Sequence, residues 1–103
     1  MTIKVSVGIG LHNEDWNSAA IWASEVERLG VDTIWSAETW GFDATSPLAF
    51  LASHTNTINL GTGIMQIGAR SPATIAMTAL SLASMTNDRF ILGLGTSGPQ
   101  VIE

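Results

Sequence analysis

Four short segments of the sequence hold the side chains that could take part directly in a reaction. They are His12 to Asp15, Glu38 to Asp43, Thr62 to Ser71 and Thr96 to Gln100. His12 could act as a general base, because an imidazole gains and loses its proton near neutral pH. It could equally hydrogen-bond a loop carbonyl, and no partner in the sequence decides between these two roles.

Glu38 and Arg70 each allow a functional and a structural interpretation. A carboxylate at the end of a strand can accept hydrogen bonds from a ligand, and Trp40 and Phe42 beside it could form a wall against a ring. Alternatively, Glu38 caps a neighbouring helix and the two aromatic side chains close the rim of the sheet. Arg70 could bind an anion, or it could pair with an acidic neighbour.

The sequence lacks the residue combinations that hydrolases and metalloenzymes use. No carboxylate pair, Ser-His-Asp set or histidine cluster with metal-ligand spacing is present, and there is no cysteine. His54 falls near the end of a predicted helix, where a half-exposed histidine is favoured by the helix dipole. No metal site is therefore predicted.

The segment from Gly93 to Gly98, GLGTSG, formally matches the G-x-G-x-x-G pattern of dinucleotide-binding folds. The match is weak, because that pattern belongs to the first strand-helix turn and Gly93 falls inside a later predicted strand. Thr96, Ser97 and Gly98 could still form a phosphate cradle at the start of a helix. A simple turn of small residues is the alternative.

An alternation of strand and helix patterns must position these segments. Strands are predicted at 3–11, at 33–37, from 58 and at 90–94, with helices at 16–29, 47–55 and 72–85. Three helix starts carry cap signals, and Gly30 is a stop signal; the caps are Asp15, Ser46 before Pro47 and Ser71 before Pro72. Ile75, Ala79, Leu82 and Met85 are expected on the buried face of the last helix, and Trp16, Trp22 and Trp35 in the core.

The order βαβαβαβ predicts a parallel sheet covered by helices. A doubly wound open sheet and a (β/α)8 barrel share this signature, and in both the functional residues follow the carboxyl ends of the strands. A barrel needs about 250 residues, whereas this chain has 103. We therefore interpret residues 1–103 as one partial barrel domain with four strands and three helices. An open sheet and two copies that complete each other as a homodimer are the alternatives.

Composition limits the partners that we expect. The net charge is −5 with only four lysines and arginines, which argues against a nucleic acid partner. No apolar run reaches the about 18 residues of a membrane helix, and the first residues lack the pattern of a signal peptide. A cytoplasmic protein that acts on a small molecule and has no membrane partner is therefore predicted.

Three segments together resemble one family. LGVDTIWSAE, INLGTGIMQIGARSPATIAMTA and DRFILGLGTSGPQVIE are similar to the luciferase-like monooxygenase superfamily, and more narrowly to its oxidoreductases dependent on coenzyme F420, a deazaflavin. The resemblance covers nearly the whole chain. It implies a (β/α)8 TIM barrel of about 300 residues, of which this chain would be the N-terminal half.

The resemblance also implies roles for the strand ends. Strand three of the family ends in a bulge with a non-prolyl cis peptide that presses on the back of the cofactor ring. The matching bond is Gly63–Ile64, followed by Met65. Gly61, Gly63 and Gly68 would then be positions of close approach to that flat ring. The family implies that Glu38 and Thr39 lie near the ring, and that Thr96, Ser97 and Gly98 hold the phosphate-bearing tail.

One difference from the family reduces the number of reactions that we expect. Several deazaflavin-dependent alcohol dehydrogenases have an acidic residue and then histidine at the end of strand two, whereas this chain has Glu38 and Thr39. This disfavours alcohol oxidation unless His12 substitutes, and leaves open the reduction of an imine, an enoyl group or a methylene carrier. We expect hydride transfer between F420 and a small organic substrate. An FMN-dependent monooxygenase and an inactive half-barrel scaffold are the alternatives.

Overall fold

Four parallel strands form the sheet of this protein in the computed structural model, which describes residues 4–9, 15–38 and 42–96. In spatial order they are β1 (Ser6–Gly8), β2 (Thr33–Ser36), β3 (Asn59–Thr62) and β5 (Phe90–Ile91). Beyond the ends of β3 and β5, two shorter strands pair in parallel, β4 (Met65–Gln66) and β6 (Leu94–Gly95). The helices are α1 (Trp16–Arg28), α2 (Thr45–Ala52) and α3 (Pro72–Met85), with a 3-10 turn, η1 (Ile67–Ala69), before α3.

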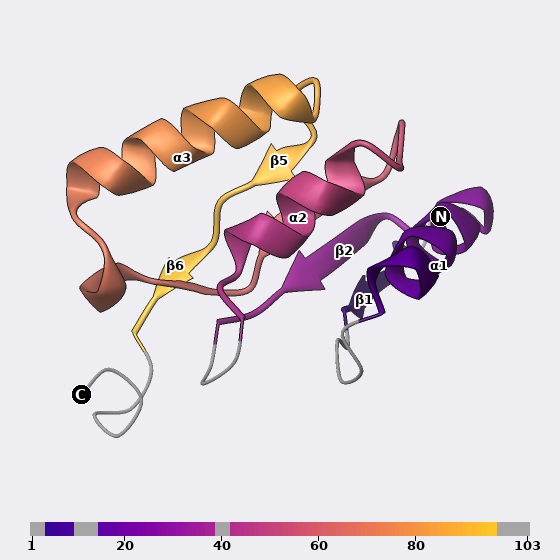
Figure 1. Ribbon diagram of the computed structural model, residues 1–103, viewed down its shortest axis with the longest axis horizontal. Helices are drawn as coiled ribbons and strands as arrows, with labels where there is room; N and C mark the ends of the chain where they lie inside the picture. The colour runs from indigo at the N-terminus through magenta and orange to yellow at the C-terminus, as the bar shows by residue number, and fades with distance from the viewer. Residues whose placement is uncertain (1–3, 10–14, 39–41, 97–103) are drawn as a thin grey trace.

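The order of the strands in space decides between the two predicted architectures. The four strands of the main sheet lie side by side in the order in which they occur along the chain. Because parallel crossovers are right-handed, a sheet that always advances in one direction has all its helices on one face. Figure 1 shows α1, α2 and α3 on the same side of the strands. This is the winding of a (β/α)8 barrel and not of a doubly wound sheet.

The core lies between the sheet and this helical layer. Ile34 of β2 and Leu60 of β3 are fully buried in one cluster with side chains of α1 and α2, among them Leu48 and Leu51. Because side chains alternate along a strand, Trp35 and Gly61 project to the opposite face. That second face corresponds to the interior of a barrel.

Two of the three predicted helix starts are confirmed. The Asp15 carboxylate accepts a hydrogen bond from the Ser18 amide at the start of α1, and Ser71 caps α3 with Pro72 in its first turn. Gly30 follows the end of α1 with a φ of 88°, a conformation that glycine adopts easily.

The predicted start of α2 at Ser46–Pro47 is wrong. The helix begins at Thr45, two residues before Pro47, and Ala44 occupies the cap position without a side-chain hydrogen bond. The Asp43 carboxylate instead accepts hydrogen bonds from the Ser46 amide and hydroxyl, each at 2.9 Å. The side chain of Asp43, one residue before Ala44, therefore caps the helix.

The predicted strands are longer than the observed ones. The strand predicted from residue 58 divides into β3 and β4, and the one predicted at 90–94 divides into β5 and β6. Of the strand predicted at 3–11, the structure describes residues 4–9 and finds a strand at Ser6–Gly8. The two segments stay paired across both divisions, because β3 pairs with β5 and β4 pairs with β6.

Some residues expected in the core are more accessible than predicted. Met85 is 54% exposed, although Ile75 and Leu82 on the same helix are buried as expected. The three tryptophans are only partly buried. Trp16 packs edge-on against Phe42 and Phe50, with ring centroids 5.7 and 5.5 Å apart. Trp35 lies on the second face of the sheet, which no helix covers in the described part of the chain.

Candidate functional site at the carboxyl ends of the strands

The bulge at residues 63–66, which comprises the two residues after β3 and the short strand β4, lies at the edge of the sheet where function is expected. The peptide bond Gly63–Ile64 is cis, which confirms the prediction made for this bond. The Gly63 amide donates a 2.8 Å hydrogen bond to the Ser36 carbonyl at the end of β2. On the other side, the Met65 amide donates a 2.8 Å hydrogen bond to the Gly93 carbonyl. The bulge therefore bridges the ends of β2 and β6.

The flat ring that Gly61 approaches belongs to this chain. A Cβ atom at Gly61 would lie 2.6 Å from the indole of Trp35, closer than real contacts allow, and one at Gly63 would lie 3.3 Å from it. A Cβ at Gly68 would meet nothing within 4 Å. Trp35 therefore accounts for Gly61 within the chain, whereas no protein atom crowds Gly68, so its approach to a cofactor ring stays a prediction. Gly63 remains exposed beside the half-buried Ile64.

Two further glycines lie opposite the bulge in the segment GLGTSG. A Cβ at Gly93 would lie 2.2 Å from the Thr62 carbonyl oxygen, and one at Gly95 would lie 2.5 Å from the side chain of Ile64. The Thr62 hydroxyl also donates to the Gly93 carbonyl and accepts from the Gly93 amide, both at 2.8 Å. These two glycines are therefore explained by packing between strands, without a nucleotide.

Glu38 follows β2 and binds the bulge from the other side. Its Oε1 accepts hydrogen bonds from the Gln66 amide at 3.0 Å and from Arg70 Nη1 at 2.6 Å. Its Oε2 accepts from the Ala44 amide at 2.9 Å and from Arg70 Nη2. The main chain of Glu38 also takes part: its amide donates to the Ile64 carbonyl at 3.3 Å, and its carbonyl accepts from Gln66 Nε2 at 3.0 Å.

This environment keeps the Glu38 carboxyl ionised. The pKa of Glu38 lies below its ordinary value, chiefly because the Arg70 side chain hydrogen-bonds the carboxylate, with further lowering by the Ala44 and Gln66 amides against the opposing effect of burial. The side chains of Glu38 and Arg70 are only 10% and 15% exposed. An ionised carboxylate with these partners does not serve as a proton donor, so the structural interpretations of Glu38 and Arg70 are favoured.

The other predicted site residues are distributed as follows. Thr96 is exposed directly after β6, the strand that pairs with β4, and Met65 of β4 is fully buried, with no side-chain surface for a ligand. His12, Thr39, Ser97 and Gly98 lie outside the described residues, as does Trp40, so their roles stay predictions.

The ion pair of Glu38 with Arg70 and the hydrogen bonds between Glu38 and Gln66 were not predicted from the sequence. A signal for them was present. Glu38 follows one strand and Gln66 and Arg70 follow the next, and the carboxyl ends of parallel neighbours meet at one edge of a sheet.

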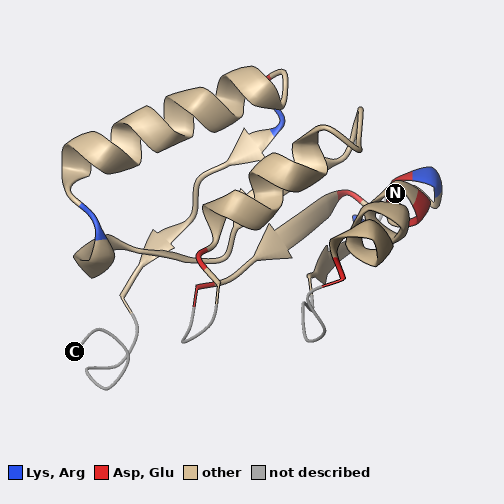
Figure 2. Cartoon of the chain, viewed as in Figure 1, with Lys and Arg blue, Asp and Glu red and all other residues tan. Residues whose placement is uncertain are grey.

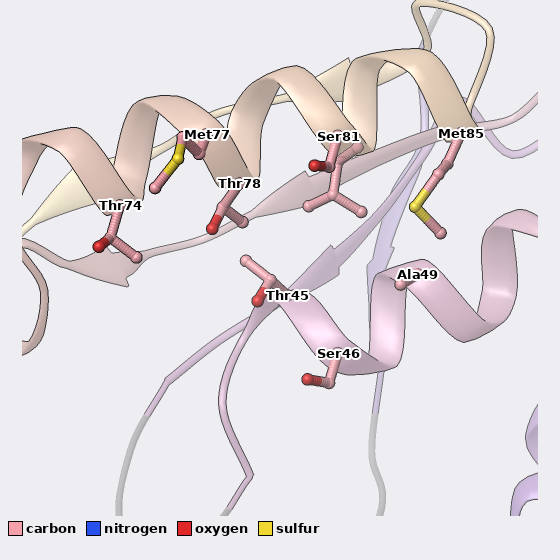
Figure 3. Close-up of a pocket in the computed structure, with 9 residues that line it drawn as sticks. Thr45, Ser46, Ala49, Thr74, Met77, Thr78, Ser81 and Met85 are labelled. Carbon is pink, nitrogen blue, oxygen red and sulfur yellow. The ribbon is translucent and has the colours of Figure 1, made fainter.

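A groove of about 280 Å³ lies between α2 and α3, lined among others by Thr45, Ala49, Met77, Thr78 and Met85 (Figure 3). It runs along the helical layer, and Figure 2 shows no charged residue on either helix. The groove therefore lacks the charged groups that the strand ends bring together.

Within residues 4–9, 15–38 and 42–96, no cluster of three or more metal-ligating side chains occurs. None of the helices in the same ranges is long and apolar enough to cross a membrane.

Comparison with known proteins identifies the family to which the chain belongs. The sequence profile of the luciferase-like monooxygenase family matches residues 1–103. The chain therefore belongs to the luciferase-like monooxygenase family.

Individual relatives agree with this assignment. A Mycobacterium tuberculosis protein, provisionally named a coenzyme F420-dependent oxidoreductase, is 51% identical over 77 residues, which are 75% of this chain and 22% of that protein. Among solved structures, the coenzyme F420-dependent tetrahydromethanopterin reductase of Methanopyrus kandleri superposes with a TM-score of 0.85 at 20% identity. That superposition covers 98% of this chain and 29% of the reductase.

A second solved structure extends the fold comparison. The oxygenating constituent of 3,6-diketocamphane monooxygenase from Pseudomonas putida, in complex with FMN, superposes with a TM-score of 0.84 at 16% identity. The superposition covers 96% of this chain and 31% of the monooxygenase. The chain thus spans only about a quarter to a third of the length of these relatives.

Proposed function

We propose that this chain is part of an oxidoreductase that transfers a hydride between coenzyme F420 and a small organic substrate. The observation that carries the proposal is the bulge at residues 63–66, which exposes Gly63 at the carboxyl ends of the strands and is held from both sides by backbone hydrogen bonds. The similarity to the F420-named protein of M. tuberculosis supports it.

The residues of the bulge fit a planar cofactor. Gly63 has no side chain on the exposed edge, and Ile64 beside it is apolar and half-buried. An apolar and rigid surface suits the face of a conjugated ring. When bound, the deazaflavin would supply the hydride at its C5 carbon, and the protein would supply orientation. Gly63 and Ile64 would support the ring, and Thr96, Ser97 and Gly98 would hold the phosphate-bearing tail.

The proposed substrates follow from the acid-base groups near the bulge. Glu38 is ionised and saturated with hydrogen bonds, so it cannot donate a proton, and its neighbour in the sequence is Thr39 instead of a histidine. Reduction of an imine, an enoyl group or a methylene carrier is therefore proposed ahead of alcohol oxidation. We further propose that this reaction takes place in the cytoplasm.

The second candidate is an FMN-dependent monooxygenase. The contacts around Gly63 and Ile64 are mainly made by the backbone and by apolar groups, which do not distinguish a deazaflavin from the isoalloxazine ring of FMN. The two rings differ in chemistry, because a deazaflavin reacts poorly with oxygen.

A titration of the full-length protein tests the proposal. F420 and FMN are titrated separately under reducing and oxidising conditions, and oxygen consumption is followed with each reduced cofactor. The proposal expects saturable binding of F420 without oxygen consumption. Binding of FMN alone, with oxygen uptake, would establish the second candidate instead, and binding of neither would refute both.

A further inference from the structure

We propose that Glu38 is a positioning residue that fixes residues 63–66 to the end of β2, with Arg70 as its counter-ion, and that it does not take part in proton transfer. The inference deepens the proposed function, and rests on it, because the fixed bulge is the surface assigned to the cofactor ring. It concerns a side chain that the family resemblance places near the cofactor ring.

The contacts of Glu38 span the whole bulge. Its amide binds the Ile64 carbonyl, immediately after the cis bond, and its carbonyl and carboxylate bind the side chain and the amide of Gln66. With the Gly63 amide bound to Ser36, the first, second and fourth residues of the bulge are all tied to the end of β2. Glu38 accounts for three of these four hydrogen bonds.

The carboxylate has no acceptor capacity left for a ligand. An ionised carboxylate offers about four lone-pair sites, two on each oxygen. In Glu38, Oε1 accepts from Gln66 and Arg70, and Oε2 accepts from Ala44 and Arg70. A direct ligand role would therefore require one of these hydrogen bonds to break.

Charge and burial explain why a carboxylate is needed here. The two side chains are almost enclosed, at 10% and 15% exposure, and removal of one partner would leave the other as an unpaired charge in a poorly solvated place. Glutamine has one acceptor oxygen, and its NH2 group would face the Arg70 guanidinium, which offers only donors. A charge-reversed pair would restore the attraction but not the bonds from the Gln66 and Ala44 amides, because arginine cannot accept hydrogen bonds.

The test combines backbone exchange with enzyme kinetics in the full-length protein. The variants are Glu38→Gln, Arg70→Lys and the double variant Glu38→Arg/Arg70→Glu. Glu25→Gln is the matched control, because Glu25 forms an exposed ion pair with Arg28 on α1, with 54% and 65% side-chain exposure. Hydrogen exchange of the 63–70 peptide is measured without cofactor, followed by cofactor affinity and the pH profile of kcat/KM.

We expect the 63–70 amides to exchange about tenfold faster in Glu38→Gln, because charged hydrogen bonds to the backbone are lost. In the same variant, kcat/KM should fall by about 100-fold through misplacement of the ring, with an unchanged shape of the pH profile. The reversed pair should not restore either quantity. Arg70→Lys, which keeps the charge but loses the two-pronged contact, should show the same changes more weakly.

Three outcomes would overturn the proposal. Exchange at 63–70 that is the same in Glu38→Gln and in Glu25→Gln would show that Glu38 does not fix the bulge. Loss of one limb of the pH profile would assign Glu38 to proton transfer, and full rescue by the reversed pair would reduce its role to charge alone. If Glu38→Gln fails to fold, Arg70→Lys decides by the same exchange measurement. The exchange result is independent of the cofactor, so it stands even if the wild-type protein binds neither F420 nor FMN.

Discussion

At the scale of single residues, two side chains join the ends of the strands through hydrogen bonds to backbone groups. The Thr62 hydroxyl donates to the Gly93 carbonyl and accepts from the Gly93 amide, in the manner of a neighbouring strand. Glu38 does the same for the amides of Ala44 and Gln66. Both side chains accept hydrogen bonds from backbone amides in partly buried places, where an unpaired donor is costly.

Replacement of Thr62 by valine keeps the shape of the side chain but removes both hydrogen bonds. Because Thr62 is fully buried, the Gly93 amide would lose its acceptor, and the Gly93 carbonyl would keep only the hydrogen bond from the Met65 amide. We expect a loss of about 2 kcal/mol in the free energy of unfolding, measured by urea denaturation of the full-length protein. Thr78→Val, in the groove on the helical layer, should change stability far less. Equal stability of the two variants would contradict this account of Thr62.

The ionisation of Glu38 predicts a pH dependence of stability. Its pKa is lower in the folded protein than in the unfolded chain, mainly because of Arg70. The unfolded chain therefore binds the proton more readily, so the stabilisation is present above an unfolded pKa of about 4.3 and is lost as the pH falls through the folded pKa. The difference in unfolding free energy between wild type and Glu38→Gln should shrink in this acidic range. A difference that stays constant down to about pH 3 would contradict the prediction.

At the scale of elements, the local signals were predictable and the contacts between strands were not. Asp15 and Ser71–Pro72 mark helix starts because a cap acts on amides within its own turn. The start of α2 was predicted two residues late, because Asp43 satisfies the Ser46 amide from outside the serine-proline signal. The divisions of the third and fourth predicted strands depend on contacts between residues about 30 positions apart, such as Thr62 and Gly93.

Alanine substitutions at two glycines distinguish the effect of steric crowding on stability from the effect of reduced chain flexibility. Gly93→Ala would place a Cβ atom 2.2 Å from the Thr62 carbonyl oxygen and force the ends of β3 and β6 apart. We expect a loss of about 3 kcal/mol in the free energy of unfolding, as for other overpacked sites. Gly68→Ala is the matched control, because its Cβ would meet nothing within 4 Å. Chemical denaturation of both variants checks the prediction, which fails if Gly93→Ala is as stable as Gly68→Ala.

At the scale of the whole molecule, the order β1-β2-β3-β5 and the helices on one face define a segment of a barrel. The alternation of strands and helices predicted a parallel sheet, but two architectures stayed open until the strand order was known. Trp35 lies on the second face of the sheet, in register with Gly61 of β3, and Ile91 of β5 follows in the same row. In a closed barrel this row would be covered by the remaining strands.

The uncovered second face predicts the behaviour of residues 1–103 expressed alone. Ile91 is 37% exposed, and Trp35 is only partly buried. Four strands cannot close a barrel, and the open edges and apolar face should cause association between copies. We expect the sedimentation coefficient of this segment to rise with concentration, whereas the full-length protein should not show association through this face. A segment that stays monomeric at high concentration would contradict the prediction.

The central claim is that the bulge at residues 63–66 is the surface on which the cofactor ring rests. The most direct measurement is hydrogen exchange of the full-length protein with and without saturating F420. The account predicts slower exchange in the peptides that contain residues 63–66 and 96–98, with little change in the last turn of α1, where Glu27 binds the amides that precede β3 at the opposite edge of the sheet. Saturable F420 binding that leaves the exchange of residues 63–66 unchanged would contradict the claim.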